Sequence, residues 1–267
     1  MANVPFTSSL KTEYENLFNT CLIRPERMGT AEALIEGLLS HRKAYDNVAV
    51  ALGIPWFFIA VIHNMESSQN FTRHLHNGDP LTGRTVQVPS GRPKKGTPPF
   101  TWEQSAADAL TMKGLGAGTD WSLAGTLYQV ERYNGWGYRL YHQHVLSPYL
   151  WSFSNHYISG KYVADGTWSD TAVSKQCGAA VLLRRMTETG QIEFYDQPVP
   201  GDTARPLINY SKSKSSDPAI AARVESLQRW LNTFPGIFVK VDGIPGKRTS
   251  TAYKRVTGAY LSGDPRG

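Results

Sequence analysis

The sequence predicts a mainly α-helical protein of two domains joined by a linker, and three observations predict it. Apolar residues recur at intervals of three and four in several segments of residues 1–190, the spacing of a helix with one buried face. Residues 191–217 are rich in proline, serine and lysine and lack such a pattern, as expected of a linker. The net positive charge is concentrated after this linker, in residues 218–267.

Five helices are expected in the first domain. Residues 30–45 carry a single apolar stripe, and residues 55–65 are apolar nearly all round, which indicates a central, buried helix. Between the second and third helices, residues 70–100 are irregular, with a turn at 77–80 and alternating residues at 85–88 that suit a short strand. The remaining helices are expected over residues 101–113, with Thr101 as N-cap, and over residues 120–132 and 170–188.

The charge distribution indicates a small basic module attached to a nearly neutral body. Of the 28 Lys and Arg residues, eight lie in residues 218–267, together with only three of the 22 Asp and Glu residues. A basic module favours polyanionic partners: nucleic acid, a membrane surface or an anionic wall polymer. This module is expected to begin with a helix capped by Asp217, with Pro218 in its first turn.

Other features of the sequence exclude several classes of protein. The longest apolar run, residues 54–62, is about half of the roughly 18 to 20 residues that a membrane span requires, so no span is expected. The N-terminus lacks the pattern of a signal peptide, so we expect synthesis in the cytoplasm without a recognisable export signal. Cys21 and Cys177 are too few for a disulfide framework and are expected to be free thiols. A monomer is expected.

Glu66 is the strongest candidate for a catalytic group. It follows the most hydrophobic predicted helix, and apolar surroundings raise the pKa of a carboxyl group toward the range that a general acid needs at neutral pH. The alternative is that Glu66 lies in water at the end of that helix and has no catalytic role.

Two short motifs resemble those of known lytic enzymes. Glu66-Ser67-Ser68, with Phe71 just beyond, resembles the Glu-Ser motif of lysozyme-like enzymes, in which the glutamate protonates the glycosidic oxygen. Residues 133–137, Tyr-Asn-Gly-Trp-Gly, resemble the Tyr-Asn-x-Gly motif that lines the same cleft in lytic transglycosylases, although the Gly-Leu-Met-Gln segment of that family is absent. The resemblance implies a lysozyme-like α (α+β) catalytic domain over residues 1–190. It also implies sugar-binding roles for a set of polar and aromatic residues: Ser68, Tyr133, Asn134, Trp136 and Tyr138.

A second polar group facing the acid is expected in the irregular segment. Asp79 and Thr85 resemble the aspartate and threonine that position the attacking water in phage-type lysozymes. The alternative for Asp79 is a structural role in the Asn-Gly-Asp-Pro turn. If no such group acts, closure of the sugar on itself to an anhydro product remains open, with Glu66 as both acid and base. Glu103 and Glu131 are further candidate acids, each with a structural role as the alternative.

The basic module resembles the small three-helix peptidoglycan-binding domain (type 1). The residues that carry the resemblance are Leu-Gln-x-x-Leu-Asn at 227–232 and Val-Asp-Gly-x-x-Gly-x-x-Thr at 241–249. No nucleic-acid-binding motif accompanies them, so the expected partner is peptidoglycan and not nucleic acid. Taken together, the resemblances imply a peptidoglycan glycosidase that acts in the periplasm or cell wall without a cofactor or metal.

Two other functions are compatible with the sequence. The first is a zinc-dependent peptidoglycan peptidase or amidase, with ligands among His63, Glu66, His74 and His76. The second is a non-catalytic protein that binds the cell wall.

Overall fold

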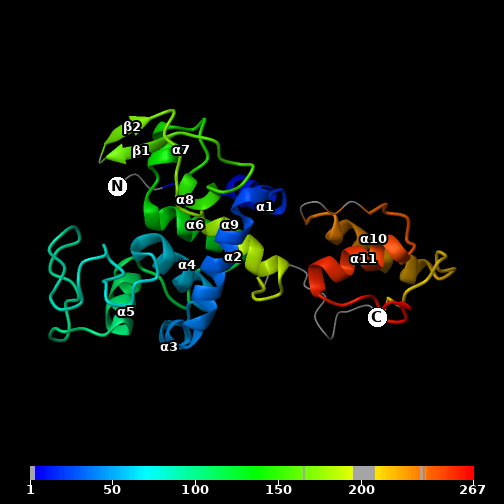
Figure 1. Cartoon of the computed structure of the whole chain (residues 1–267), viewed down its shortest axis with the longest axis horizontal. Helices are drawn as coiled ribbons and strands as arrows, with labels where there is room; N and C mark the ends of the chain where they lie inside the picture. The colour runs from blue at the N-terminus through cyan, green and yellow to red at the C-terminus, as the bar shows by residue number, and fades with distance from the viewer. Residues whose placement is uncertain (1–3, 165, 195–207, 235–236, 238) are drawn as a thin grey trace.

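The computed structural model describes residues 4–164, 166–194, 208–234, 237 and 239–267, and the part described is mainly α-helical, as predicted (Figure 1). Nine helices and a two-stranded antiparallel hairpin precede residue 195, and two helices follow residue 207, among the described residues. The first group consists of α1 (Ser8–Asn19), α2 (Pro25–Ser40), α3 (Arg42–Leu52), α4 (Trp56–Ser67), α5 (Trp102–Met112), α6 (Leu123–Asn134), α7 (Gly137–Tyr141), α8 (Pro148–Trp151), β1 (Lys161–Ala164), β2 (Thr167–Ser169) and α9 (Ala179–Glu188). The second group consists of α10 (Pro218–Leu231) and α11 (Lys247–Thr257).

Helix α4 lies at the centre of the first domain, as its composition predicts. Its residues from Trp56 to Met65 are all buried, and α2, α3, α6 and α9 pack around it. A helix that is apolar on every face is stable in water only where other elements cover every face. This environment determines the position of Glu66, which lies in the last turn of α4.

The predicted helix over residues 30–45 is two helices, which meet at His41. The Ser40 hydroxyl donates to the Gly37 carbonyl oxygen at 2.8 Å, and the His41 Nδ1 lies 3.0 Å from the same oxygen. Side chains that bond to a backbone carbonyl compete with the next turn of a helix. We attribute the end of α2 at Ser40 to this competition.

The predicted helix over residues 170–188 begins nine residues later than expected, at Ala179. Just before it, the backbone of Gly178 passes so close to α8 that a Cβ atom there would lie 2.2 Å from the Leu150 carbonyl oxygen. The chain must approach α8 at this point before it can turn into α9. By contrast, α5 begins as predicted after Thr101, whose hydroxyl accepts from the Gln104 N–H in a capping box. Helix α6 begins after Ser122, close to the predicted start.

Residues 85–88 do not form the predicted strand. The N–H groups of Val86 and Gln87 donate to the Asp79 carboxylate at 2.8 and 3.1 Å, so they are not available to a neighbouring strand. The strands that the structure contains in its described part are β1 and β2, which the sequence analysis missed.

The irregular segment between α4 and α5 is held against α5 by buried polar groups (Figure 1). His74 Nδ1 lies 2.8 Å from the Ser105 hydroxyl, and His76 Nε2 lies 2.8 Å from the Asp108 carboxylate. Arg92, later in the segment, forms an ion pair with the same carboxylate at 2.8 Å. These interactions fix both the beginning and the middle of the segment on one helix.

The second domain has its own hydrophobic core, in which α10 packs on α11. The Asp217 carboxylate caps α10, with Pro218 at its first position, as predicted. The buried Gln228 side chain donates to Asp242, Ile244 and Thr249 and accepts from the N–H groups of Asp242 and Gly243. The expected third helix is not present among the described residues of this domain, in which the helices are α10 and α11.

The described ends of the expected linker belong to the two cores. Ile192 and Phe194 pack in the first core and Ile208 in the second, while residues 195–207 lie outside the described part of the chain. The domains also touch through Arg184 of α9, whose guanidinium lies 4.9 Å from the centre of the Phe234 ring.

Two further expectations from composition concern cysteines and membrane spans. Cys21 and Cys177 are both buried and free of disulfide bonds. No single helix in the described ranges is long and apolar enough to cross a membrane, and α3 and α4 reach that length only as a pair bent by 118°.

Candidate active site

Glu66 lies where the central helix reaches the surface. The residues before it in α4 are buried, and Glu66 itself is half-buried. Ser68 ends the helix in the left-handed conformation, with φ of 51°, and its N–H still donates to the Asn64 carbonyl oxygen at 3.2 Å. Helix α4 therefore ends directly after Glu66, so the Glu66 carboxyl group lies at the C-terminal end of a buried apolar helix.

Burial raises the pKa of the Glu66 carboxyl group. The Tyr149 hydroxyl, which donates to Glu66 Oε1 at 2.7 Å, and the positive charge of Lys113 oppose this rise, and burial has the larger effect. Burial and the nearby Glu66 charge raise the pKa of Tyr133 and of Tyr149 well above their usual value, so both phenols stay protonated. The site thus combines an acid that retains its proton to higher pH with neutral hydroxyl groups beside it.

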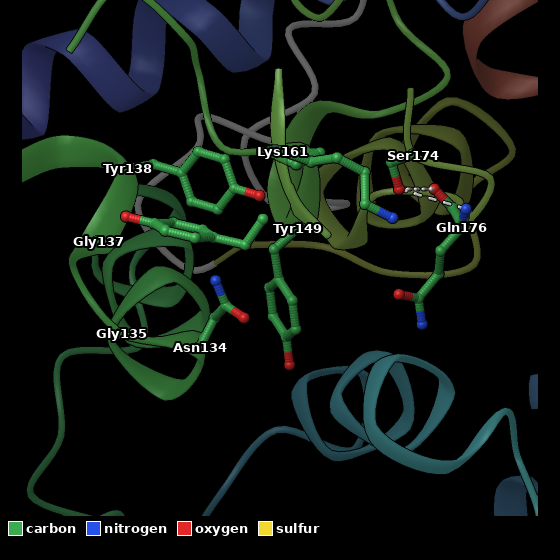
Figure 2. A pocket seen from close by; sticks show the side chains of 10 residues that line it. Asn134, Gly135, Gly137, Tyr138, Tyr149, Lys161, Ser174 and Gln176 are labelled. Atoms are coloured by element: carbon green, nitrogen blue, oxygen red, sulfur yellow. Dashed lines mark hydrogen bonds between the residues drawn. The ribbon is translucent and has the colours of Figure 1, made fainter. Parts of the chain in front are cut away.

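A pocket of about 320 Å³ adjoins this acid, and Tyr149 connects the two. Figure 2 shows the Tyr149 ring in the pocket wall with its hydroxyl directed away from the pocket, toward α4. Gln176 makes a second connection, because its side-chain amide donates to the Met65 carbonyl oxygen at 2.8 Å. The lining residues come from four parts of the chain: Asn134, Gly135, Gly137 and Tyr138; Pro148 and Tyr149; Lys161 and Tyr162; Ser174 and Gln176.

Of the expected sugar-binding residues, Asn134 and Tyr138 line this pocket. Tyr133 is buried and is not in the lining; its hydroxyl donates to the Leu75 carbonyl oxygen at 3.2 Å, and its ring lies 4.8 Å from Lys113 Nζ. Trp136 is buried against Tyr128, with ring centres 5.0 Å apart, and is not in the lining. Ser68 is exposed and is also outside the lining.

Asp79 organises the segment that follows Glu66. Its Oδ2 accepts from Val86 N–H, Gln87 N–H and the Asn77 amide. Burial raises the pKa of this carboxyl group, but these three donors together outweigh burial, so the pKa lies below its usual value and Asp79 stays ionised. The turn at residues 77–80 lies against the end of α4: a Cβ on Gly78 would be 3.6 Å from the Glu66 carbonyl oxygen.

Thr85 is buried in the same segment, and its hydroxyl is already occupied. It donates to the Pro89 carbonyl oxygen at 2.5 Å and accepts from the Arg92 N–H at 2.9 Å. In this arrangement the Thr85 hydroxyl stabilises the loop, and its proton points to the backbone.

The two alternative acids lie in other environments. Glu103 is in the first turn of α5, where a carboxylate complements the helix dipole. Glu131 is buried and accepts from the Tyr14 hydroxyl, and it forms an ion pair with Arg139 at 2.8 Å. Glu131 therefore joins α1, α6 and α7.

The histidines of the zinc alternative bond to separate partners. His63 Nδ1 lies 3.0 Å from the Tyr45 hydroxyl, while His74 and His76 bond to α5. No group of three or more His, Cys, Asp or Glu side chains within the described ranges is arranged to hold a metal ion.

The sequence analysis did not assign roles to Lys113, Lys161 or Gln176, and it did not place Tyr149 beside Glu66. Tyr149 is 83 positions from Glu66 in the sequence, and the two meet only because α8 packs on α6 and α9 beside α4. No local pattern reports such a contact. The proline before Tyr149, which begins the short helix α8, is a signal of structure and not of chemistry.

Comparison of the chain with models of known protein families, with curated proteins and with solved structures found no match.

Proposed function

We propose that this protein is a peptidoglycan-degrading glycosidase that cleaves the β-1,4 bond between N-acetylmuramic acid and N-acetylglucosamine. The observation that carries the proposal is the environment of the Glu66 carboxyl group. Burial raises the pKa of its carboxyl group, and Tyr149 links it to a pocket lined by tyrosines and amides. Aromatic faces stack on the apolar face of a pyranose ring, and amide groups bond to its hydroxyl and acetamido groups.

In the proposed reaction Glu66 is the general acid. Its proton passes to the glycosidic oxygen as the bond from that oxygen to the anomeric carbon breaks. Tyr149 holds the carboxyl group through Oε1, which leaves Oε2 for the leaving-group oxygen. Lys113, whose charge acts on Glu66, favours the carboxylate that forms once the proton has left.

Two second steps complete the reaction, and they give different products. Water that attacks the anomeric carbon gives a reducing end, and its proton passes to a carboxylate; Asp79, which stays ionised, is the candidate that the sequence supplies. Alternatively, the muramic acid 6-hydroxyl attacks the same carbon, its proton returns to Glu66, and a 1,6-anhydro sugar forms. The occupied Thr85 hydroxyl gives no particular support to the first route.

The second domain is proposed to bind the same polymer. Its basic excess suits an anionic wall, and tethering of the two domains raises the local concentration of glycan at the site without adding contacts there. In this proposal the first domain is lysozyme-like and the second is a peptidoglycan-binding module. The protein acts in the periplasm or cell wall.

The test is mass spectrometry of the soluble fragments released from purified peptidoglycan. Wild type is expected to release muropeptides, with a reducing end if water attacks and 18 mass units lighter if the sugar closes on itself. Glu66→Gln is expected to lower the release by at least about a hundredfold, as loss of general acid catalysis does. Glu103→Gln, the same chemical change at a helix start, is the matched control and is expected to act as wild type.

Three results would contradict the proposal. Intact glycan strands with cleaved stem peptides would indicate the peptidase or amidase. Binding to peptidoglycan without any release would indicate a non-catalytic wall-binding protein. Equal activity of wild type and Glu66→Gln would place the acid elsewhere.

A further inference from the structure

The pocket beside Glu66 contains one kind of charge only. Among the residues that line it, Lys161 is the single charged side chain, and the others are tyrosines, amides, a serine, a proline and glycines. A pocket for a neutral glycan needs no charged group, since hydroxyl and acetamido groups are satisfied by neutral donors and acceptors. The lysine is therefore a feature that neutral sugar binding leaves unexplained.

The ammonium group of Lys161 is available to a ligand. It has no hydrogen-bond or ion-pair partner among the residues that the structure describes, and its side chain is half-buried. Figure 2 shows this side chain extending along the pocket, with its nitrogen directed to the side where Ser174 and Gln176 lie. Glu66 is not the partner of this ammonium group, because the cation that acts on Glu66 is Lys113.

The position of Lys161 is defined by packing of the β hairpin. Lys161 pairs with Ser169 of β2, and the next residue, Tyr162, packs on Tyr138 with ring centres 5.5 Å apart. Tyr162 also lies against α7, where a Cβ on Gly137 would meet its hydroxyl at 3.3 Å. A larger residue at position 137 would require the Tyr162 ring to shift by a few tenths of an ångström. The ammonium is thus presented to the pocket by a fixed wall.

We propose that Lys161 binds a carboxylate of the glycan and selects carboxylated substrates over neutral ones such as chitin. This inference rests on the proposed function and deepens it by naming the substrate class. An ammonium group forms a charge-assisted hydrogen bond to a carboxylate, and this bond is stronger than one between neutral groups. A partly enclosed pocket screens that charge less than open water does.

Peptidoglycan supplies a carboxylate from two sources. One is the lactyl group on muramic acid, which is free where the stem peptide has been removed. The other is the stem peptide itself, which carries carboxylates of its own. Both present the same chemistry to Lys161 and differ in their distance from the sugar ring, so separate ligands distinguish them.

The experiment measures equilibrium dissociation constants for three soluble tetrasaccharides at low salt. The first has alternating N-acetylglucosamine and N-acetylmuramic acid with free lactyl groups, the second is the same glycan with stem peptides, and the third is chitotetraose. All proteins carry Glu66→Gln to prevent turnover, alone or combined with Lys161→Met, Lys161→Arg or Lys175→Met. Lys175 is exposed and outside the lining, so its substitution controls for loss of net charge.

Lys161→Met is expected to weaken binding of a carboxylated ligand about tenfold, or about 1.4 kcal/mol, and to leave chitotetraose binding within about twofold. Lys161→Arg and Lys175→Met are expected to bind as the parent does. An effect on the first ligand indicates the lactyl carboxylate, and an effect confined to the second indicates the stem. Equal effects on all three ligands, no effect, or no binding of any ligand would overturn the proposal.

Binding without turnover also separates this inference from the proposed function. A charge-selective pocket in a protein that releases no glycan fragments would uphold the inference and refute the glycosidase. Glycan release by the wild type, together with unchanged selectivity in Lys161→Met, would uphold the glycosidase and refute the role of Lys161.

Discussion

Tyr149→Phe is expected to raise the pKa of the Glu66 carboxyl group further and to extend activity to higher pH. The hydroxyl of Tyr149 donates to Glu66 Oε1 at 2.7 Å and so favours the ionised form. A hydrogen bond to a charged group contributes about 1.5 to 3 kcal/mol, and 1.36 kcal/mol corresponds to one pH unit. The alkaline midpoint of the activity profile is therefore expected to move up by about 1 to 2 pH units.

The assay is the pH dependence of kcat/KM on soluble glycan fragments, because this parameter reports the ionisation of the free enzyme. In the proposed reaction the protonated carboxyl is the active form, so a higher pKa moves the falling limb of the activity profile to higher pH. Tyr138→Phe is the matched control, since Tyr138 lines the same pocket but does not bond to Glu66. A falling limb that stays in place, or moves to lower pH, in Tyr149→Phe would refute the account of Glu66.

Three other changes have expected outcomes of their own. Arg139→Met is expected to cost about 3 to 5 kcal/mol in the free energy of unfolding, because it leaves the buried Glu131 carboxylate without its cation. Urea unfolding measures the cost, and addition of Glu131→Gln should recover part of it. Asp79→Ala is expected to speed exchange of the Val86 amide hydrogen by at least about tenfold, since that N–H loses its acceptor; unchanged exchange would contradict the role of Asp79 in the loop. Glu66→Gln is expected to raise Tm relative to wild type at pH 7 but not near pH 3, because the raised pKa of Glu66 costs the folded state stability as pH rises. Thermal unfolding at the two pH values checks this, and an equal difference at both would contradict it.

The sequence predicts those parts of the fold that depend on local pattern. The buried helix before Glu66 follows from an unbroken apolar run, and the starts of α5 and α10 follow from capping residues with their own hydrogen bonds. Glu66 could be singled out for the same reason, because the end of an apolar helix is an unusual place for a carboxylate. In these cases the determining contacts lie within a few residues of each other.

The errors in the fold occur where distant contacts override local pattern. The alternation at residues 85–88 suits a strand, but a carboxylate at Asp79 takes up its N–H groups. Likewise α9 begins late because Gly178 must pass close to Leu150. The pocket is lined by residues from four segments of the chain, and no periodicity in the sequence indicates that these segments converge. Packing of the whole domain creates that site.

The proposed acid and the proposed selector lie on two different elements of the fold. Glu66 ends the most deeply buried helix, whereas Lys161 stands on a short hairpin joined to the body by a few aromatic contacts. Exchange of the hairpin would therefore alter the accepted polymer and leave the acid's surroundings intact. Under the two proposals, a library restricted to residues 161–169 is the place to change the accepted polymer without changing the acid.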